Sequence, residues 1–189
     1  MLGLTENKRK IVHLLALLVP VFCELTSKSV ILTVLSLITL TYVLEEVLRL
    51  KGQSLPLITS FTLKLSRPEE RISFIIRPVY LAIGVILTLI FFPSMIAYSS
   101  IWIGAIGDPV AAIVGKKFGR RRIMRQKTLE GFGAGLIASF LAASLFVSPF
   151  LALMGAVGAM FMELIDMPDD NLTMPVVAGA LMTFATLVL

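Results

Sequence analysis

Long apolar runs separated by short polar segments make up most of this chain. They predict helices, because each run is long and lacks strand-like alternation. Seven helices are expected, over residues 10–26, 29–48, 73–92, 94–115, 129–147, 149–165 and 172–189. The first and sixth runs are short for the roughly 20 residues that a membrane span needs. Six spans with a re-entrant first segment is therefore the alternative.

The composition indicates a membrane protein. Of the 189 residues, 57% are hydrophobic and 15% are charged, whereas soluble domains are about 45–50% apolar. We expect an all-α, polytopic integral membrane bundle of about seven transmembrane helices, built as a single domain over residues 1–189. Residues 52–71, between two predicted spans, are expected to hold an interfacial helix.

The basic residues predict the orientation. With the N-terminus in the cytoplasm, all of the 17 lysines and arginines except Lys28 and Arg77 fall in cytoplasmic segments. The positive-inside rule therefore predicts a cytoplasmic N-terminus and an external C-terminus. Because this rule explains the net charge of +5, no nucleic-acid partner is expected. We expect the cell membrane, or the endoplasmic reticulum in a eukaryote, with the functional site on the cytoplasmic side.

Ionisable residues inside predicted spans are costly in lipid and are candidates for function. They are His13, Glu24, Arg77, Asp108, Glu130 and Glu163. All of the carboxylates except Glu24 fall near cytoplasmic ends of spans, as do the seven basic residues of segment 116–127. Such a cluster suits a magnesium–triphosphate, because Mg²⁺ takes one or two carboxylates plus phosphate oxygens and basic side chains neutralise the remaining phosphate charge.

The glycines are divided between two roles. Gly107 and Gly119 adjoin the polar cluster, and we expect them to let backbone N–H groups approach phosphate. Five other glycines are expected at closely packed helix faces, one of which allows a homodimer. They are Gly131, Gly133, Gly135, Gly155 and Gly158. With one histidine and one cysteine, Cys23, the chain offers neither a zinc site nor a disulfide, and no Walker-type phosphate loop is found.

Three segments resemble a known family. IGDPVAAIVGKKFGRRRI (106–123), KTLEG (127–131) and DDNLTMPVVAG (169–179) resemble the CTP-dependent polyprenol kinases, which include dolichol kinase, phytol kinase and CTP-dependent diacylglycerol kinase. RKIVH (9–13) and EEVLR (45–49) are similar too. The related phosphatidate cytidylyltransferases share the central block, but this chain has DDNLTMP in place of their later PGHGG…D signature.

The resemblance implies transfer of the γ-phosphoryl group of CTP to the hydroxyl of a membrane polyprenol of the dolichol or geranylgeraniol type. The products would be a polyprenyl phosphate and CDP. CDP-lipid synthesis and diacylglycerol phosphorylation are the alternative reactions. A small transporter or a structural membrane protein is the alternative that involves no enzyme.

The resemblance also implies roles for individual residues. Asp108 and Asp170 would be the ligands of Mg²⁺. The general base for the lipid hydroxyl would be Asp108, Asp169 or His13. The residues expected to bind CTP are Gly107, Lys116, Gly119, Arg120, Lys127, Glu130 and Asn171. Among these, Glu130 would orient Lys127 or the metal shell, and Asn171 would bind phosphate, ribose or base.

Overall fold

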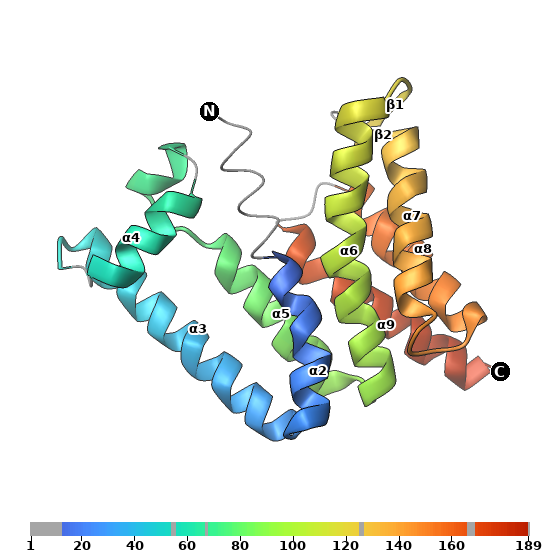
Figure 1. The fold of residues 1–189 in the computed structure, drawn as a ribbon, viewed down its shortest axis with the longest axis horizontal. Helices are drawn as coiled ribbons and strands as arrows, with labels where there is room; N and C mark the ends of the chain where they lie inside the picture. Colours follow the sequence, from blue (N-terminus) through green and yellow to red (C-terminus); the bar gives the residue numbers. More distant parts are fainter. Residues whose placement is uncertain (1–12, 54–55, 67, 125–126, 166–168, 189) are drawn as a thin grey trace. The chain divides into compact units, whose positions relative to one another are not determined.

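The computed structural model describes residues 13–53, 56–66, 68–124, 127–165 and 169–188 (Figure 1). The chain divides into two compact units, residues 1–83 and 84–189. The first unit holds η1 (Leu15–Leu17), α2 (Leu18–Leu25), α3 (Lys28–Leu50), α4 (Pro56–Leu65) and η2 (Pro68–Ile72). Helix α5 (Arg77–Phe91) crosses the boundary. The second unit continues with α6 (Ser94–Phe118), β1 (Arg122–Met124), β2 (Lys127–Thr128), α7 (Leu129–Ala143), α8 (Pro149–Leu164) and α9 (Asp170–Val188).

The all-α prediction is confirmed. Within the described part of the chain, three helices, α3, α6 and α9, are long and apolar enough to cross a membrane. The other apolar segments form shorter helices, which are Leu15–Leu25, α5, α7 and α8. Each predicted span is therefore helical over much of its length, whereas the number of membrane crossings and their orientation stay predictions. Helix α4 lies in the segment where an interfacial helix was expected.

Helix α5 begins later than the sequence predicted. The apolar run suggested a start at residue 73, but the helix starts at Arg77. The residues before it are held instead by side chains of α3. Glu46 Oε2 accepts the N–H of Ile75 at 2.9 Å, and the hydroxyl of Tyr42 donates to the Ile75 carbonyl at 2.8 Å. These bonds satisfy backbone groups that a longer helix would have used.

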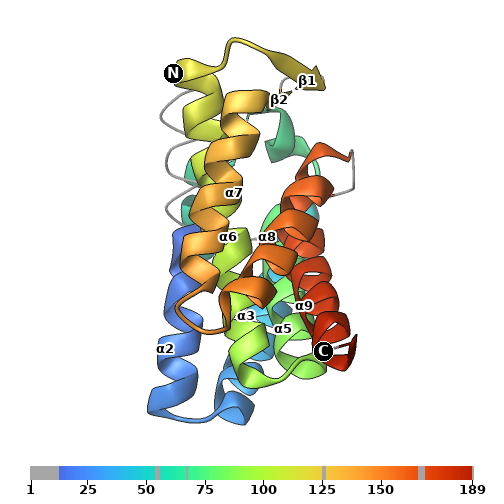
Figure 2. The same cartoon turned by 90° about the vertical axis from the view of Figure 1, so that its right-hand side faces the viewer.

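The core of the second unit is formed around α6, against which α7, α8 and α9 pack (Figures 1 and 2). Its completely buried side chains include Ile103 of α6, Met160 of α8 and Met182 of α9. Small residues fill the rest of this core, among them Ala143, Ala152, Ala159 and Ala178. Alanine and methionine let these helices approach closely without leaving voids.

Helices α6 and α7 approach each other backbone to backbone. A Cβ atom added at Gly131 would lie 2.7 Å from the carbonyl oxygen of Ala111, and one added at Gly135 would lie 2.8 Å from the Ala111 Cβ. The packing interpretation of Gly131 and Gly135 is confirmed. For Gly133 it is not, since nothing lies within 4 Å of the same added atom. The close approach brings the C-terminal end of α6 to the start of α7.

A short antiparallel hairpin, β1–β2, joins these two helices (Figure 2). The N–H of Leu129 donates to the carbonyl of Arg121 at 2.9 Å and closes the base of the hairpin. Thr128 then caps α7, because its hydroxyl accepts the N–H of Gly131 at 3.2 Å. The hairpin and the cap together fix Lys127 immediately before the first turn of α7.

Candidate functional site

Lys127 pairs with two carboxylates of the second unit and interacts electrostatically with a third. Its ammonium donates to Glu163 Oε1 at 2.5 Å and lies 3.7 Å from Asp170 Oδ2. Asp108 also interacts with this ammonium through its charge. The four residues come from α6, β2, α8 and α9, and we refer to them as the Lys127 cluster. Asp108 and Asp170, the predicted metal ligands, therefore share one neighbour although they are far apart in sequence.

Two helix ends bring Glu163 and Asp170 into the Lys127 cluster. Glu163 is the penultimate residue of α8, and Asp170 is the first residue of α9. The backbone of α5 comes close to the start of α9 at Gly84, where an added Cβ would lie 2.5 Å from the carbonyl oxygen of Asn171. A larger residue at position 84 would displace the first turn of α9. Gly84 thus helps to set the position of Asp170.

Burial and charge act in opposite directions on Lys127. Burial lowers the pKa of its ammonium, whereas the hydrogen bond and charge of Glu163, followed by the charges of Asp170 and Asp108, raise it. The balance leaves the pKa above its ordinary value of 10.5. Lys127 is therefore cationic at neutral pH. Its Glu163 partner is 3% exposed as a side chain, and burying this carboxylate would be costly without a paired cation.

The Lys127 cluster offers carboxylates that could hold a divalent cation together with a phosphate ligand. Its three carboxylates outnumber its one ammonium, so negative charge is in excess when all four groups are ionised. Among the residues that the structure describes, no group of three or more acidic, histidine or cysteine side chains is spaced to hold a metal ion by itself. Mg²⁺ is commonly held by one or two carboxylates and completed by substrate phosphates and water, and Asp108 and Asp170 offer such a partial set.

The basic turn between α6 and α7 is held by Glu130. Its carboxylate accepts the backbone N–H of Arg120 at 3.0 Å and that of Arg121 at 3.3 Å. The basic side chains of the turn are exposed, and they are Lys116, Lys117, Arg120, Arg121 and Arg122. We expected Glu130 to orient Lys127 or the metal shell. The observed partner of Lys127 is Glu163 instead, while Glu130 orders the cationic turn.

The two glycines expected at the nucleotide have packing contacts in the structure. Gly107 is buried, and an added Cβ would collide with the hydroxyl of Ser139 and press on Met160 and Met174. Gly119 ends α6, and an added Cβ there would collide with the Thr128 side chain. These contacts explain why both positions are glycine. A role of either residue in binding CTP stays a prediction.

The remaining predicted residues lie in different parts of the chain. Asp169 caps α9, because its Oδ1 accepts the N–H of Asn171 at 2.9 Å. Asn171 itself is half-buried in the first turn of that helix. His13 is buried within the first unit, so its part in the site stays a prediction. Residues 9–12 of RKIVH and residue 166 of the loop before α9 lie outside the described residues.

The role of Glu163 was not predicted from the sequence. This residue was identified as an ionisable residue inside an apolar helix and as a member of the carboxylate cluster, but no individual role was given to it. Its partner Lys127 is 36 positions away, so no local spacing could have indicated the pair. The signal that was available is the carboxylate near the end of an otherwise apolar helix, since such residues in membrane proteins are paired or functional.

Comparisons with known proteins place the chain among relatives whose names state no activity. The chain is 28% identical over 183 residues to an uncharacterized protein of Rickettsia prowazekii (strain Madrid E), and the match covers 90% of this chain and 89% of that protein. It is also 34% identical over 109 residues to an uncharacterized protein of Methanocaldococcus jannaschii. This match covers 53% of this chain and 54% of that protein. No family model matches the chain. No solved structure matches it either.

Proposed function

We propose that this protein is a CTP-dependent lipid kinase that phosphorylates a membrane polyprenol of the dolichol or geranylgeraniol type. The observation that carries the proposal is the Lys127 cluster, in which a cationic lysine and three carboxylates from four elements meet beside an exposed basic turn. The resemblance of the segments around Asp108, Lys127 and Asp170 to the CTP-dependent polyprenol kinases supplies the nucleotide and the lipid alcohol.

The proposed reaction is a displacement at the γ-phosphorus of CTP. The hydroxyl oxygen of the lipid forms a bond to this phosphorus while the bond to the β–γ bridging oxygen breaks. CDP leaves with that oxygen, and the hydroxyl proton passes to a base of the protein. Asp108, Asp169 and His13 are the candidates for this base. Catalysis of such a transfer depends mainly on positioning the reactants and stabilising charge.

The residues of the site divide this work among them. Lys127, Lys116 and Arg120 bind phosphate oxygens through their charges. Asp108 and Asp170 would hold Mg²⁺, which when bound neutralises charge on the phosphates. Glu163 positions Lys127, and Glu130 positions the backbone of the basic turn. The glycines Gly107 and Gly119 and the side chain of Asn171 complete the proposed nucleotide site.

The membrane supplies the second substrate. Apolar helices α3, α6 and α9 are long enough to cross a bilayer, and a polyprenol dissolved there has to bring only its hydroxyl to the site. We propose that the chain crosses the membrane about seven times with its N-terminus and active site in the cytoplasm, as the distribution of basic residues favours. Close packing of small residues would also support a homodimer.

The proposal is tested with purified protein, Mg²⁺ and CTP that carries its label on either the α- or the γ-phosphate. Polyprenol, phytol and diacylglycerol serve as acceptors, and ATP, GTP and UTP serve as competing donors. A lipid kinase transfers the γ-label to the lipid, whereas CDP-lipid synthesis transfers the α-label. Absence of either label from every acceptor would contradict an enzymatic function of this kind and favour a transporter or a structural role.

A further inference from the structure

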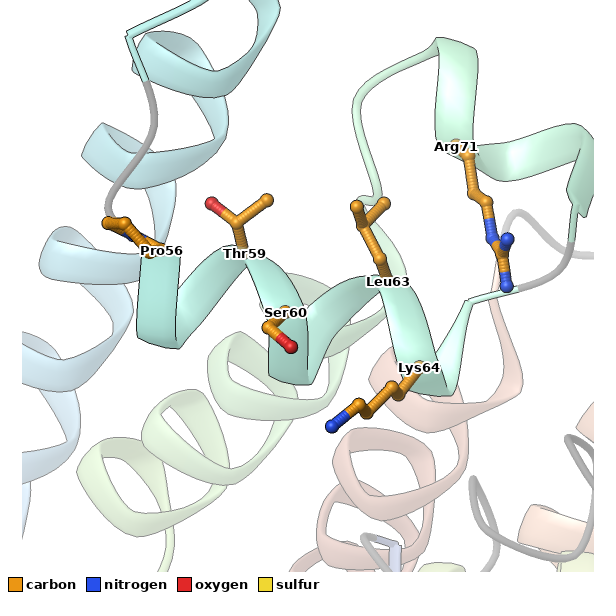
Figure 3. Close-up of a pocket in the computed structure, with 6 residues that line it drawn as sticks. All are labelled: Pro56, Thr59, Ser60, Leu63, Lys64 and Arg71. Atoms are coloured by element: carbon orange, nitrogen blue, oxygen red, sulfur yellow. The ribbon is translucent and has the colours of Figure 1, made fainter.

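A second polar surface is formed in the first unit by residues that take no part in the Lys127 cluster. It is a shallow, open depression of about 440 Å³. Figure 3 shows the side chains that line it, which are Pro56, Thr59, Ser60, Leu63, Lys64 and Arg71. Two of them are cationic, two carry hydroxyls and two are apolar. The lining therefore combines positive charge, hydrogen-bond donors and an apolar patch.

One wall of the depression is α4, which a buried glutamate attaches to α3. The hydroxyl of Thr59 donates to Glu45 Oε1. Glu45 is 1% exposed, so its carboxylate lies behind the wall and away from solvent. This bond restricts the rotation of α4 about its own axis. Ser60 and Lys64 of the same helix are exposed at the surface.

The opposite wall carries Arg71 and is attached to α3 by a second buried glutamate. Glu46, which is 0% exposed, accepts two hydrogen bonds from Arg49 at 2.9 and 2.8 Å. The guanidinium of Arg49 in turn donates to the carbonyls of Arg71 and Ser73 at 2.7 and 2.6 Å. The backbone at Arg71 is therefore held by a charged network, while the Arg71 side chain is exposed.

Both walls thus depend on the EEVLR segment, residues 45–49, for which the proposed reaction gives no role. Burying two adjacent glutamates is costly unless each is well bonded. They bond to the segments that carry two exposed cations, Lys64 and Arg71, both of which line the depression. A site whose charged groups are already in place loses less entropy when a ligand binds.

We propose that this depression binds the phosphate of an anionic phospholipid headgroup. Lys64 and Arg71 match the charge of the phosphate, and the hydroxyl of Ser60 can donate to its oxygens. Leu63 and Pro56 provide apolar contact for the glycerol and the first acyl carbons.

The position of α4 along the chain favours a lipid over a free phosphate ion. The helix follows α3 after a short connection. Helix α3 exposes large apolar side chains, such as Leu37, Ile38 and Leu40, over its length. If α3 crosses the bilayer, its end at Leu50 lies near the headgroups, where basic residues attract anionic lipids. The depression on α4 would then face the phosphates of the same leaflet.

The test uses the full-length protein in a mild detergent and titrates it with short-chain phosphatidylglycerol, phosphatidylcholine or inorganic phosphate. Bound lipid is counted by native mass spectrometry. Lys64→Ala/Arg71→Ala is compared with Lys51→Ala/Lys117→Ala, which removes the same charge from exposed positions outside the depression. We expect phosphatidylglycerol affinity to fall about tenfold or more in the first variant and less than about twofold in the control.

A charge-conserving variant, Lys64→Arg/Arg71→Lys, guards against a loss of binding through misfolding and is expected to retain most of the affinity. The proposal is overturned if the depression variant and the control lose the same affinity, or if neither loses any. It is also overturned if inorganic phosphate or phosphatidylcholine binds as tightly as phosphatidylglycerol. Because the readout is lipid binding, its outcome is independent of whether the protein transfers phosphate from CTP.

Discussion

The ammonium of Lys127 lies 2.5 Å from Oε1 of Glu163, and this contact joins β2 to the end of α8. This bond neutralises a carboxylate that is almost completely buried. It also holds the lysine 3.7 Å from Oδ2 of Asp170, which we propose as a metal ligand together with Asp108. The pair therefore links the packing of the second unit to the geometry of the proposed active site.

Replacing Glu163 with glutamine should weaken the interaction between this side chain and the ammonium of Lys127. The amide can still accept a hydrogen bond, but it no longer carries the charge that pairs with the ammonium. We expect a loss of about 1–3 kcal/mol in the free energy of unfolding and a fall in lipid phosphorylation of about tenfold or more. Glu24→Gln, at an exposed carboxylate of the first unit, is the control. Unchanged stability and activity in Glu163→Gln would contradict the positioning role.

The raised pKa of Lys127 gives a prediction about pH. A group whose pKa is higher in the folded state contributes stability below its ordinary pKa, and this contribution is lost as the pH rises through the folded value. For Lys127 the loss should therefore begin above 10.5. The difference in unfolding free energy between wild type and Lys127→Met should therefore fall as the pH rises above 10.5. Thermal unfolding at several pH values measures it, and a difference that does not fall above this pH would argue against the ion pair.

Alanine substitutions at two glycines of α7 should change the stability differently, because only one of the two packs against α6. Gly131→Ala places a methyl group 2.7 Å from the carbonyl oxygen of Ala111, and such overpacking costs about 1–3 kcal/mol. Gly133→Ala places the same group where nothing lies within 4 Å, and it should be neutral or stabilise by up to about 1 kcal/mol. The melting temperatures of both variants check this. Equal effects would mean that the two helices are not in close contact at Gly131.

The Glu46–Arg49 network should contribute strongly to the stability of the first unit. Arg49→Gln leaves the buried Glu46 without its cation, and breaking one partner of a buried pair costs about 3–5 kcal/mol. Arg77→Gln is the matched control, because its ion pair with Glu70 is more exposed, at 42% and 22%, and should contribute less than about 1 kcal/mol. Limited proteolysis near Arg71 would show whether the segment is released. Similar resistance of the two variants would contradict the network's role.

The sequence predicted the helices well because their signal is local. Apolar runs of sufficient length form helices wherever they occur in a membrane-type chain, and all seven runs contain helix. The boundaries were less accurate where side chains from another helix compete for the backbone. Residues 73–76 are the example, since Glu46 and Tyr42 of α3 bond to Ile75 and delay the start of α5.

The candidate site was predicted as a set of residues but not as a set of contacts. Asp108 could be chosen because ionisable residues inside apolar spans are unusual, whereas Lys127 and Asp170 were assigned their roles from the resemblance to the CTP-dependent polyprenol kinases. Their partners depend on which helices pack together, which no local pattern reveals. Glu130 was therefore expected to orient Lys127 or the metal shell, whereas the contacts of its carboxylate are with the backbone N–H groups of Arg120 and Arg121.

The central claim is that the Lys127 cluster carries phosphoryl transfer from CTP to a lipid alcohol. The most direct measurement follows the γ-label of CTP into polyprenol with wild-type protein and with Asp170→Asn, at matched amounts of folded protein. The account predicts γ-labelled polyprenyl phosphate from the wild type and a loss of about a hundredfold or more in the variant. Transfer by Asp170→Asn at the wild-type rate, or the absence of γ-label from lipid in the wild type, would contradict it.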